Sequence, residues 1–239
     1  HRLGPNKRVL TGVGQPFNDL IKLFAKTEYA YTNIKTNIFI LRPLLIVVFS
    51  IIIWISFSHE GNRNGIKSFL VFVIALNGVL IFFFLFPGWR RGSTYRILGG
   101  YRASAQCISY EGVFFFCFLC IIFMFFSFNL IEAKTLINFT RILLIMYPLT
   151  ICWILSIMAE TNRSPFDFAE GERELVSGFN TEYGRGIFSI IFLREYISIL
   201  FYSFLTSFFF FSQIIEFLLG MFLIILTFVW IRLAFPRFR

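Results

Sequence analysis

The fold is decided by an uncharged run in the middle of the chain, Val113-Phe-Phe-Phe-Cys-Phe-Leu-Cys-Ile-Ile-Phe-Met-Phe-Phe-Ser-Phe-Asn-Leu-Ile131. As a helix rising about 1.5 Å per residue, a run of this length crosses nearly all of the roughly 30 Å hydrocarbon core of a bilayer. A helix also satisfies its own backbone hydrogen bonds, as a segment surrounded by lipid must. The run therefore predicts a transmembrane helix.

The whole chain has the same apolar character. Of its 239 residues, 57% are hydrophobic, 21% are aromatic and only 15% are charged, and 36 are phenylalanine. Soluble domains carry roughly 25% charged residues, which cover the surface that faces water. The composition therefore excludes a soluble globular protein. The net charge of +9 is better explained by loops that orient a membrane protein than by nucleic-acid binding.

We expect an all-α fold, a polytopic membrane helix bundle with six transmembrane helices plus an N-terminal interfacial amphipathic helix, in one membrane domain covering 1–239. The expected spans are about 38–57, 68–86, 103–131, 142–159, 187–207 and 214–234. In the first span, the long side chain of Arg42 can bring its charge to the near interface. The stretch 187–234 is too long for one span and divides at a polar turn. The polar residues near that turn are Ser207, Ser212, Gln213 and Glu216.

Positive charges are concentrated on one side of the expected membrane domain. Six spans place both termini on the same side, and all but four of the 22 Lys and Arg residues fall in segments on that side. The four exceptions are Arg63, Lys67, Lys134 and Arg141. Because loops rich in Lys and Arg stay on the cytoplasmic or matrix side, we expect both termini there.

The interfacial segment 1–37 contains an apolar stripe. Its members recur at the spacing of one helix face: Phe17, Leu20, Ile21 and Phe24. Pro16 suits the first turn of a helix. This pattern predicts an amphipathic helix lying in the membrane interface, although simple packing on the membrane domain is an alternative. Beside a polar cavity, such a helix would suit the entry of a long-tailed amphiphile such as a quinone.

The expected inside loop 160–186 carries the longest polar motif, Glu160-Thr-Asn-Arg-Ser-Pro-Phe-Asp-Phe-Ala-Glu-Gly-Glu-Arg-Glu-Leu-Val-Ser-Gly-Phe-Asn-Thr-Glu182. Six of the 13 acidic residues lie in it: Glu160, Asp167, Glu170, Glu172, Glu174 and Glu182. Carboxylates packed closely at low dielectric cannot all stay ionised, so some of their pKa values should rise toward neutrality, as proton transfer requires. A solvated acidic loop is the alternative. The interleaved Leu175, Val176 and Phe179 favour a packed loop.

Two further acids fall inside expected spans. Glu111 lies about two turns after the expected start of the third span, and Glu195 lies about 12 Å along the fifth span from Ile187. An acidic side chain within a membrane is costly and by default indicates function, often proton relay. The alternative is a structural salt bridge, for example of Glu195 with Arg194 or with an arginine of the 90–102 loop.

The sequence shows no pattern typical of a metal or cofactor site. Cys117 and Cys120 form a C-x-x-C pair, but inside an uncharged run a zinc ion would lack His or acidic ligands. His1 and His59 have no partner at a spacing that suggests a ligand set. There is no nucleotide-binding loop, haem ligand or iron–sulfur cysteine set. We therefore expect the chain to bind no metal and no redox cofactor of its own.

Five segments carry a family resemblance. They are Arg2-Leu-Gly-Pro-Asn6, Gln15-Pro-Phe-Asn-Asp-Leu-Ile-Lys-Leu23, Arg102-Ala-Ser-Ala-Gln-Cys-Ile-Ser-Tyr-Glu111, the acidic motif from Glu160 to Tyr183, and the end from Trp230 to Arg239. In this order, along essentially the whole chain, they resemble the subunit 1 family of respiratory NADH:quinone oxidoreductase, complex I. The Phe-rich composition is typical of an AT-rich organellar genome. We therefore expect the mitochondrial inner membrane, with a bacterial plasma membrane as the alternative.

The resemblance implies an eight-span subunit at the junction of the hydrophilic and membrane arms. It would form the membrane part of the tunnel for its substrate ubiquinone and start an acidic proton path, with lipids and the other complex I subunits as partners. By resemblance, the quinone site is bordered by Gln15, Phe17, Asp19, Arg163 and Phe179. The implied proton relay consists of Glu111, Glu160, Asp167, Glu170, Glu172, Glu174, Glu182 and Glu195.

The sequence departs from the family pattern at both ends. The family's first span and its last span, beyond Phe235-Pro-Arg-Phe-Arg239, have no counterpart here. We expect separate chains to supply these two helices, or a subunit that was split at the gene level or processed. Leu3 stands where the family usually has a second basic residue, so one positive charge is lost.

Two other functions remain open at this point. One is the homologous membrane subunit of a membrane-bound hydrogenase, which shares the buried acids but needs no quinone entry. The enzyme activity of the purified assembly separates the two. The other is an independent ion transporter, which requires transport by the chain reconstituted alone.

Overall fold

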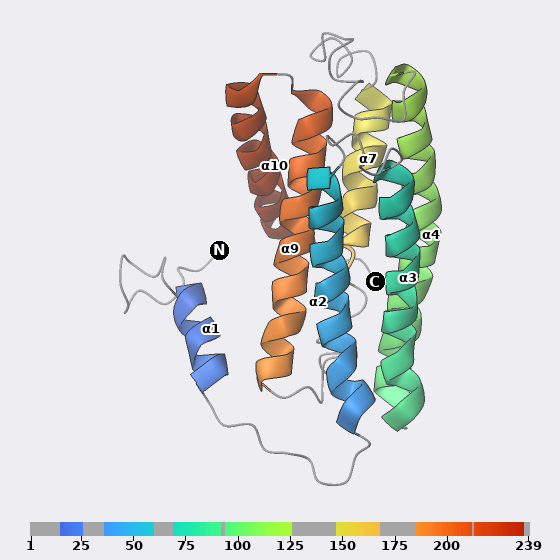
Figure 1. Cartoon of the computed structure of the whole chain (residues 1–239), viewed down its shortest axis with the longest axis vertical. Helices are drawn as coiled ribbons and strands as arrows, with labels where there is room; N and C mark the ends of the chain where they lie inside the picture. Colours follow the sequence, from blue (N-terminus) through green and yellow to red (C-terminus); the bar gives the residue numbers. More distant parts are fainter. Residues whose placement is uncertain are drawn as a thin grey trace.

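The chain folds into long helices that stand side by side. A computed structural model describes residues 15–25, 36–59, 69–91, 94–125, 147–167, 185–211 and 213–236 (Figure 1). Within these ranges all secondary structure is helical: α1 Gln15–Ala25, α2 Thr36–His59, α3 Phe69–Arg91, α4 Thr94–Phe125, α7 Tyr147–Glu160, α9 Arg185–Phe210 and α10 Ile214–Ala234. The expected all-α class is confirmed.

In the described part of the chain, the six helices that follow α1 alternate in direction. The N-terminal ends of α2, α4 and α9 and the C-terminal ends of α3, α7 and α10 lie toward the same end of the bundle, the lower end in Figure 1. Helix α1 stands outside the bundle and contacts α9. This alternation is what six consecutive spans require. The side of the membrane on which each end lies stays a prediction.

Three helices are long and apolar enough to cross a membrane, through Ile97–Phe123 of α4, Gly186–Phe210 of α9 and Ile214–Ala234 of α10. The described apolar parts of the other three are shorter: Pro43–Phe57, Val71–Phe83 and Tyr147–Glu160. A polytopic helix bundle is therefore confirmed, and the limits of each span within lipid stay predictions.

Helix α4 extends beyond the span expected from the sequence. It starts at Thr94, whereas the third span was expected to begin near Ala103, and where the helix enters lipid stays a prediction. The intervening Gly99 and Gly100 have low helix propensity, but both are buried, so packing offsets that cost. Hydropathy locates the apolar part of a helix and not its beginning. Glu111 consequently lies about 26 Å along a helix that continues well beyond it on both sides.

An aromatic core joins α4, α7 and α9. Trp153 of α7 is fully buried, and three rings surround it. Phe114 stacks on it with 5.1 Å between ring centroids, while Phe118 and Phe209 meet it edge-on at 5.0 and 5.6 Å. Buried aromatic pairs of this geometry are each worth about 0.5–1.5 kcal/mol beyond their buried area. This packing fixes the relative heights of the three helices that carry the buried acids.

A second aromatic group joins α2 to α9. Phe57 meets Phe204 edge-on at 4.7 Å, and Trp54 Nε1 donates a hydrogen bond to the Ile197 carbonyl at 3.5 Å. Helix α9 therefore packs between α2 and α10 and also contacts the α4–α7 core. It is the central helix of the bundle, and it carries Arg194 and Glu195.

The cysteines of the C-x-x-C pair lie in different environments. Cys117 is buried in the aromatic core, Cys120 is exposed, and both are free thiols. The described part of the chain contains no group of three or more His, Cys, Asp and Glu side chains that could hold a metal ion. That the whole chain binds no redox cofactor stays a prediction.

Candidate functional site

Charged side chains are buried where the end of α7 meets α9. Four of them are less than one-tenth exposed: Glu160 at 6%, Asp167 at 9%, Arg194 at 6% and Glu195 at 7%. Charged residues are almost never buried this deeply unless they are paired. Together with Arg163 and Glu111, these residues are called the charged cluster below.

The turn after α7 places the Arg163 side chain within the charged cluster. The Asn162 amide donates to the Ala159 carbonyl at 3.2 Å, and Asn162 has a backbone φ of 52°, in the left-handed region that Asn tolerates better than most residues. The Phe166 amide then donates to the Arg163 carbonyl at 2.8 Å. The chain therefore turns back toward α9 as soon as α7 ends.

Arg163 pairs with Glu195. Its Nη1 donates to Glu195 Oε2 at 2.8 Å, and the two side chains are 14% and 10% exposed. The guanidinium also lies over the ring of Tyr196, with 5.2 Å from Cζ to the ring centroid. Two consecutive residues of α9 therefore hold one arginine, by a charge-assisted hydrogen bond and by a cation–π contact.

Glu195 forms a salt bridge, the alternative to a proton relay that the sequence left open. Arg194 and an arginine of the 90–102 loop were the examples considered, but the ion pair seen among the described residues is with Arg163. Neighbouring residues on a helix point about 100° apart, so Arg194 turns away from Glu195 and toward α2. Arg194 remains close enough to act electrostatically on both Glu160 and Glu195.

Polar contacts hold α4 to the end of α7. Gln106 Nε2 donates to the Ala159 carbonyl at 2.8 Å, and Cys107 Sγ lies 3.9 Å from Asn162 Oδ1. Glu111 is one turn further along α4 than Cys107, on the same face. It is close enough to Glu160 for their carboxylates to interact electrostatically. The cluster therefore reaches across α4, α7 and α9.

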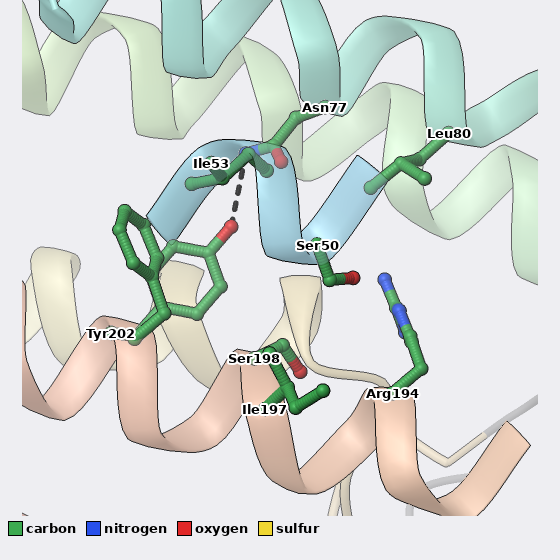
Figure 2. A pocket seen from close by; sticks show the side chains of 9 residues that line it. Ser50, Ile53, Asn77, Leu80, Arg194, Ile197, Ser198 and Tyr202 are labelled. Atoms are coloured by element: carbon green, nitrogen blue, oxygen red, sulfur yellow. Dashed lines mark hydrogen bonds between the residues drawn. The ribbon is translucent and has the colours of Figure 1, made fainter. Parts of the chain in front are cut away.

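A small polar cavity adjoins Arg194, between α2, α3 and α9 (Figure 2). Its lining residues are Ser50, Ile53, Asn77, Leu80, Arg194, Ile197, Ser198, Phe201 and Tyr202. The space open to the centres of water molecules is about 20 Å³, enough for one water. Figure 2 shows the Arg194 side chain extending from α9 toward Ser50 of α2.

Sequence reasoning missed the polar residues of this cavity. Asn77 Nδ2 donates to the Tyr202 hydroxyl at 2.9 Å, and both residues are buried. Ser50 is buried on α2. The available signal was an amide side chain in the middle of an apolar run, which costs free energy unless it is hydrogen-bonded.

Several predicted site residues lie outside what the structure describes. Residues 168–184 are not described, so the positions of Glu170, Glu172, Glu174, Phe179 and Glu182 are untested. Gln15, Phe17 and Asp19 belong to α1, but their side chains are also outside the description. On the described face of α1, Ile21 and Phe24 are 63% and 57% exposed, as an interfacial helix requires.

The sequence of this chain matches a known protein family. The family described as NADH dehydrogenase matches residues 1–239. The chain belongs to this family. It is 39% identical to NADH-ubiquinone oxidoreductase chain 1 of Aedes aegypti over 242 residues, covering 100% of this chain and 77% of the mosquito protein. The chain 1 protein of Nycticebus coucang is 37% identical and that of Anopheles gambiae 38%. The alignments cover 100% of this chain and 78% and 77% of those proteins.

Family membership confirms the resemblance seen in the motifs. The match covers the two segments Arg102–Glu111 and the acidic motif from Glu160, which supply members of the charged cluster. It also covers Arg194 and Glu195 of α9. The cluster is therefore part of the region shared with NADH dehydrogenase proteins and not of an unrelated insertion.

Proposed function

We propose that the chain is a membrane-arm subunit of a proton-pumping NADH:ubiquinone oxidoreductase. In this role it forms the membrane part of the quinone tunnel and the start of an acidic proton-coupling path. The names of its relatives support its place in this assembly. The single observation that supports the path is the charged cluster, in which four carboxylates and two guanidinium groups share the interior where α4, α7 and α9 meet.

Quinone enters, in this proposal, between α1 and the bundle. Helix α1 contacts α9 and presents exposed Ile21 and Phe24, which suit an apolar tail arriving from lipid. The side chains proposed to border the quinone are Gln15, Phe17, Asp19, Arg163 and Phe179. Of these, Arg163 is a member of the charged cluster, and the side chains of the other four lie outside what the structure describes.

Proton coupling follows from how Arg163 is held. Reduction of a quinone to a quinol takes two electrons, supplied elsewhere in the complex, and two protons. Negative charge that develops on a quinone near Arg163 competes with Glu195 for the guanidinium. Because interactions between buried charges are weakly screened, a change in that ion pair alters the field at the neighbouring carboxylates. A proton can then pass between Glu195, Glu160 and Glu111.

The proposed setting is the mitochondrial inner membrane, with both termini on the matrix side. Partners are the subunits of the hydrophilic and membrane arms and the surrounding lipids. Ubiquinone visits as a substrate, and the chain's own contribution is a set of charged groups at fixed positions.

The test uses the assembled complex carrying Asp167→Asn. Asp167 is buried and acts electrostatically on Glu195. We expect NADH:quinone reductase activity to fall by roughly tenfold or more, as when a proton-transferring group is lost, while NADH oxidation by an artificial acceptor upstream of the quinone stays unchanged. The matched control is Glu216→Gln at the start of α10. Unchanged quinone reduction in the Asp167 variant would contradict the proposal.

A further inference from the structure

The carboxylate of Glu111 lies against the backbone of α3. A Cβ atom added at Gly78 would sit 3.0 Å from Glu111 Oε1. Carbon–oxygen contacts in proteins are ordinarily about 3.3–3.6 Å even when weakly attractive. Glycine at this position therefore leaves room for the carboxylate, and a Cβ there would force the carboxylate to shift by a few tenths of an ångström.

Helices α3 and α4, between which the Glu111 carboxylate lies, are held in place by other contacts. Helices α3 and α4 pack against each other. The residue before Gly78 is Asn77, whose hydrogen bond to Tyr202 fixes the rotation of α3 against α9. On α4, Gln106 is bonded to the end of α7. The distance between Gly78 and the Glu111 backbone therefore does not depend on the Glu111 carboxylate.

We propose that Gly78 is a positioning residue for Glu111, whose carboxylate it keeps seated between α3 and α4 within electrostatic reach of Glu160. The proposal rests on the function proposed above, because it matters for activity only if Glu111 transfers protons. Displacing the carboxylate lengthens or misdirects a proton-transfer step, and such steps are sensitive to small errors in geometry.

The chain contains a matched control beside the same carboxylate. Gly112 follows Glu111 on α4, is exposed, and has no atom within 4 Å of an added Cβ. Gly78→Ala and Gly112→Ala thus make the same chemical change in a helix, with the same gain in helix propensity. Only the first places a methyl group against the carboxylate.

The experiment is a double-mutant cycle in the assembled complex. The variants are Gly78→Ala, Gly112→Ala, Glu111→Asp and the two combinations with Glu111→Asp. Quinone reductase turnover is measured for each and divided by NADH oxidation with the upstream artificial acceptor, which corrects for the amount of complex. Aspartate is one methylene shorter, so its carboxylate withdraws from a methyl group at position 78.

We expect Gly78→Ala to lower turnover by roughly three- to tenfold, the size of coupling usual between contacting groups. Gly112→Ala should stay within about twofold of the parent, as for an exposed helix position. In the Gly78→Ala background, Glu111→Asp should cost less than in the parent or restore turnover. In the Gly112→Ala background, its cost should be unchanged.

Strict additivity of Gly78→Ala and Glu111→Asp, or equal effects of the two glycine variants, would overturn the proposal. If Gly78→Ala prevents assembly, the same cycle is measured as the amount of assembled complex. Rescue by Glu111→Asp then supports the proposal, and failure to rescue contradicts it. The variant Glu111→Gln tests proton transfer by Glu111 separately from its positioning by Gly78. Full turnover of that variant would show that Glu111 is not part of the proton path. The positioning of Glu111 by Gly78 is then tested by measuring thermal inactivation in the same double-mutant cycle.

Discussion

Helices α9 and α10 are consecutive and antiparallel, and both are long and apolar enough to cross a membrane, yet their environments are opposite. In the most apolar window of α9, 39% of residues are buried, against 11% in α10. Helix α9 holds buried Arg194, Glu195 and Tyr202, whereas α10 presents Ile214 at 81% and Trp230 at 65% exposure. The difference teaches that hydropathy places a helix in the membrane, while its few polar residues indicate whether it faces protein or lipid.

The largest effect should come from breaking the ion pair on α9. Arg163→Met leaves Glu195 buried without its closest cation, which typically costs about 3–5 kcal/mol. Arg232→Met, at an exposed position of α10, removes a cation that acts more weakly on Glu195 than Arg163 does, so it should cost less. The amount of assembled complex and its thermal inactivation temperature measure both. Combining Arg163→Met with Glu195→Gln should recover stability but not quinone reduction. Equal tolerance of the two arginine variants would show that α9 and α10 do not differ in this way.

Paired leucine truncations test the same contrast without charge. Leu205 of α9 is fully buried, and Leu219 of α10 is 58% exposed. Leu205→Ala should destabilise by about 2–5 kcal/mol because it removes buried methyl groups and leaves a cavity. Leu219→Ala should cost less than about 1 kcal/mol. Thermal inactivation of the complex compares them. A larger loss for Leu219 would mean that α10 is the more tightly packed helix.

The contact between the two helices can be disturbed at one position. A Cβ on Gly220 of α10 would overlap the ring of Phe211, in the turn between α9 and α10. Gly220→Ala should therefore cost about 1–3 kcal/mol by overpacking. Adding Phe211→Ala should remove the overlap and restore most of that stability. The amount of assembled complex shows this, and no recovery in the double variant would place the strain elsewhere.

An effect of similar size is expected at the cavity of Figure 2. Tyr202→Phe removes the hydroxyl that accepts the Asn77 hydrogen bond, which should cost about 1–3 kcal/mol because a buried donor loses its partner. The control is Tyr196→Phe on the exposed side of α9, which should be nearly neutral. Adding Asn77→Leu to Tyr202→Phe should reduce the cost. Indistinguishable thermal inactivation of the two tyrosine variants would count against a structural role for this hydrogen bond.

The helical architecture could be predicted because it depends on local composition. The uncharged run around Phe118 and the long stretch divided near Gln213 follow from bilayer thickness alone. The break between α9 and α10 falls where expected, with α10 covering Ile214–Ala234. Helix α4 extends before the expected span because Gly99 and Gly100 keep helical structure through burial, which no local pattern reveals, and where that span enters lipid stays a prediction.

The site could be predicted only as a set of residues. Their places within or next to apolar spans singled out Glu111, Glu160 and Glu195, of which Glu160 and Glu195 are buried and Glu111 is half-buried. Their role as a proton relay stays a prediction. Pairing could not be predicted, because Arg163 reaches Glu195 through a turn whose geometry depends on Asn162. The seat at Gly78 could not be predicted either, since it exists only where two helices distant in sequence pack together.

The most direct test of the central claim is the quinone reductase turnover of the complex carrying Glu160→Gln. Glu160 is buried at the end of α7 and interacts electrostatically with both Glu111 and Arg194. The change keeps the shape of the side chain and removes the carboxyl group that can bind and release a proton. We predict a loss of roughly tenfold or more, with unchanged NADH oxidation by the upstream artificial acceptor and normal turnover in Glu216→Gln. Full turnover of the Glu160 variant would contradict a proton path through the charged cluster.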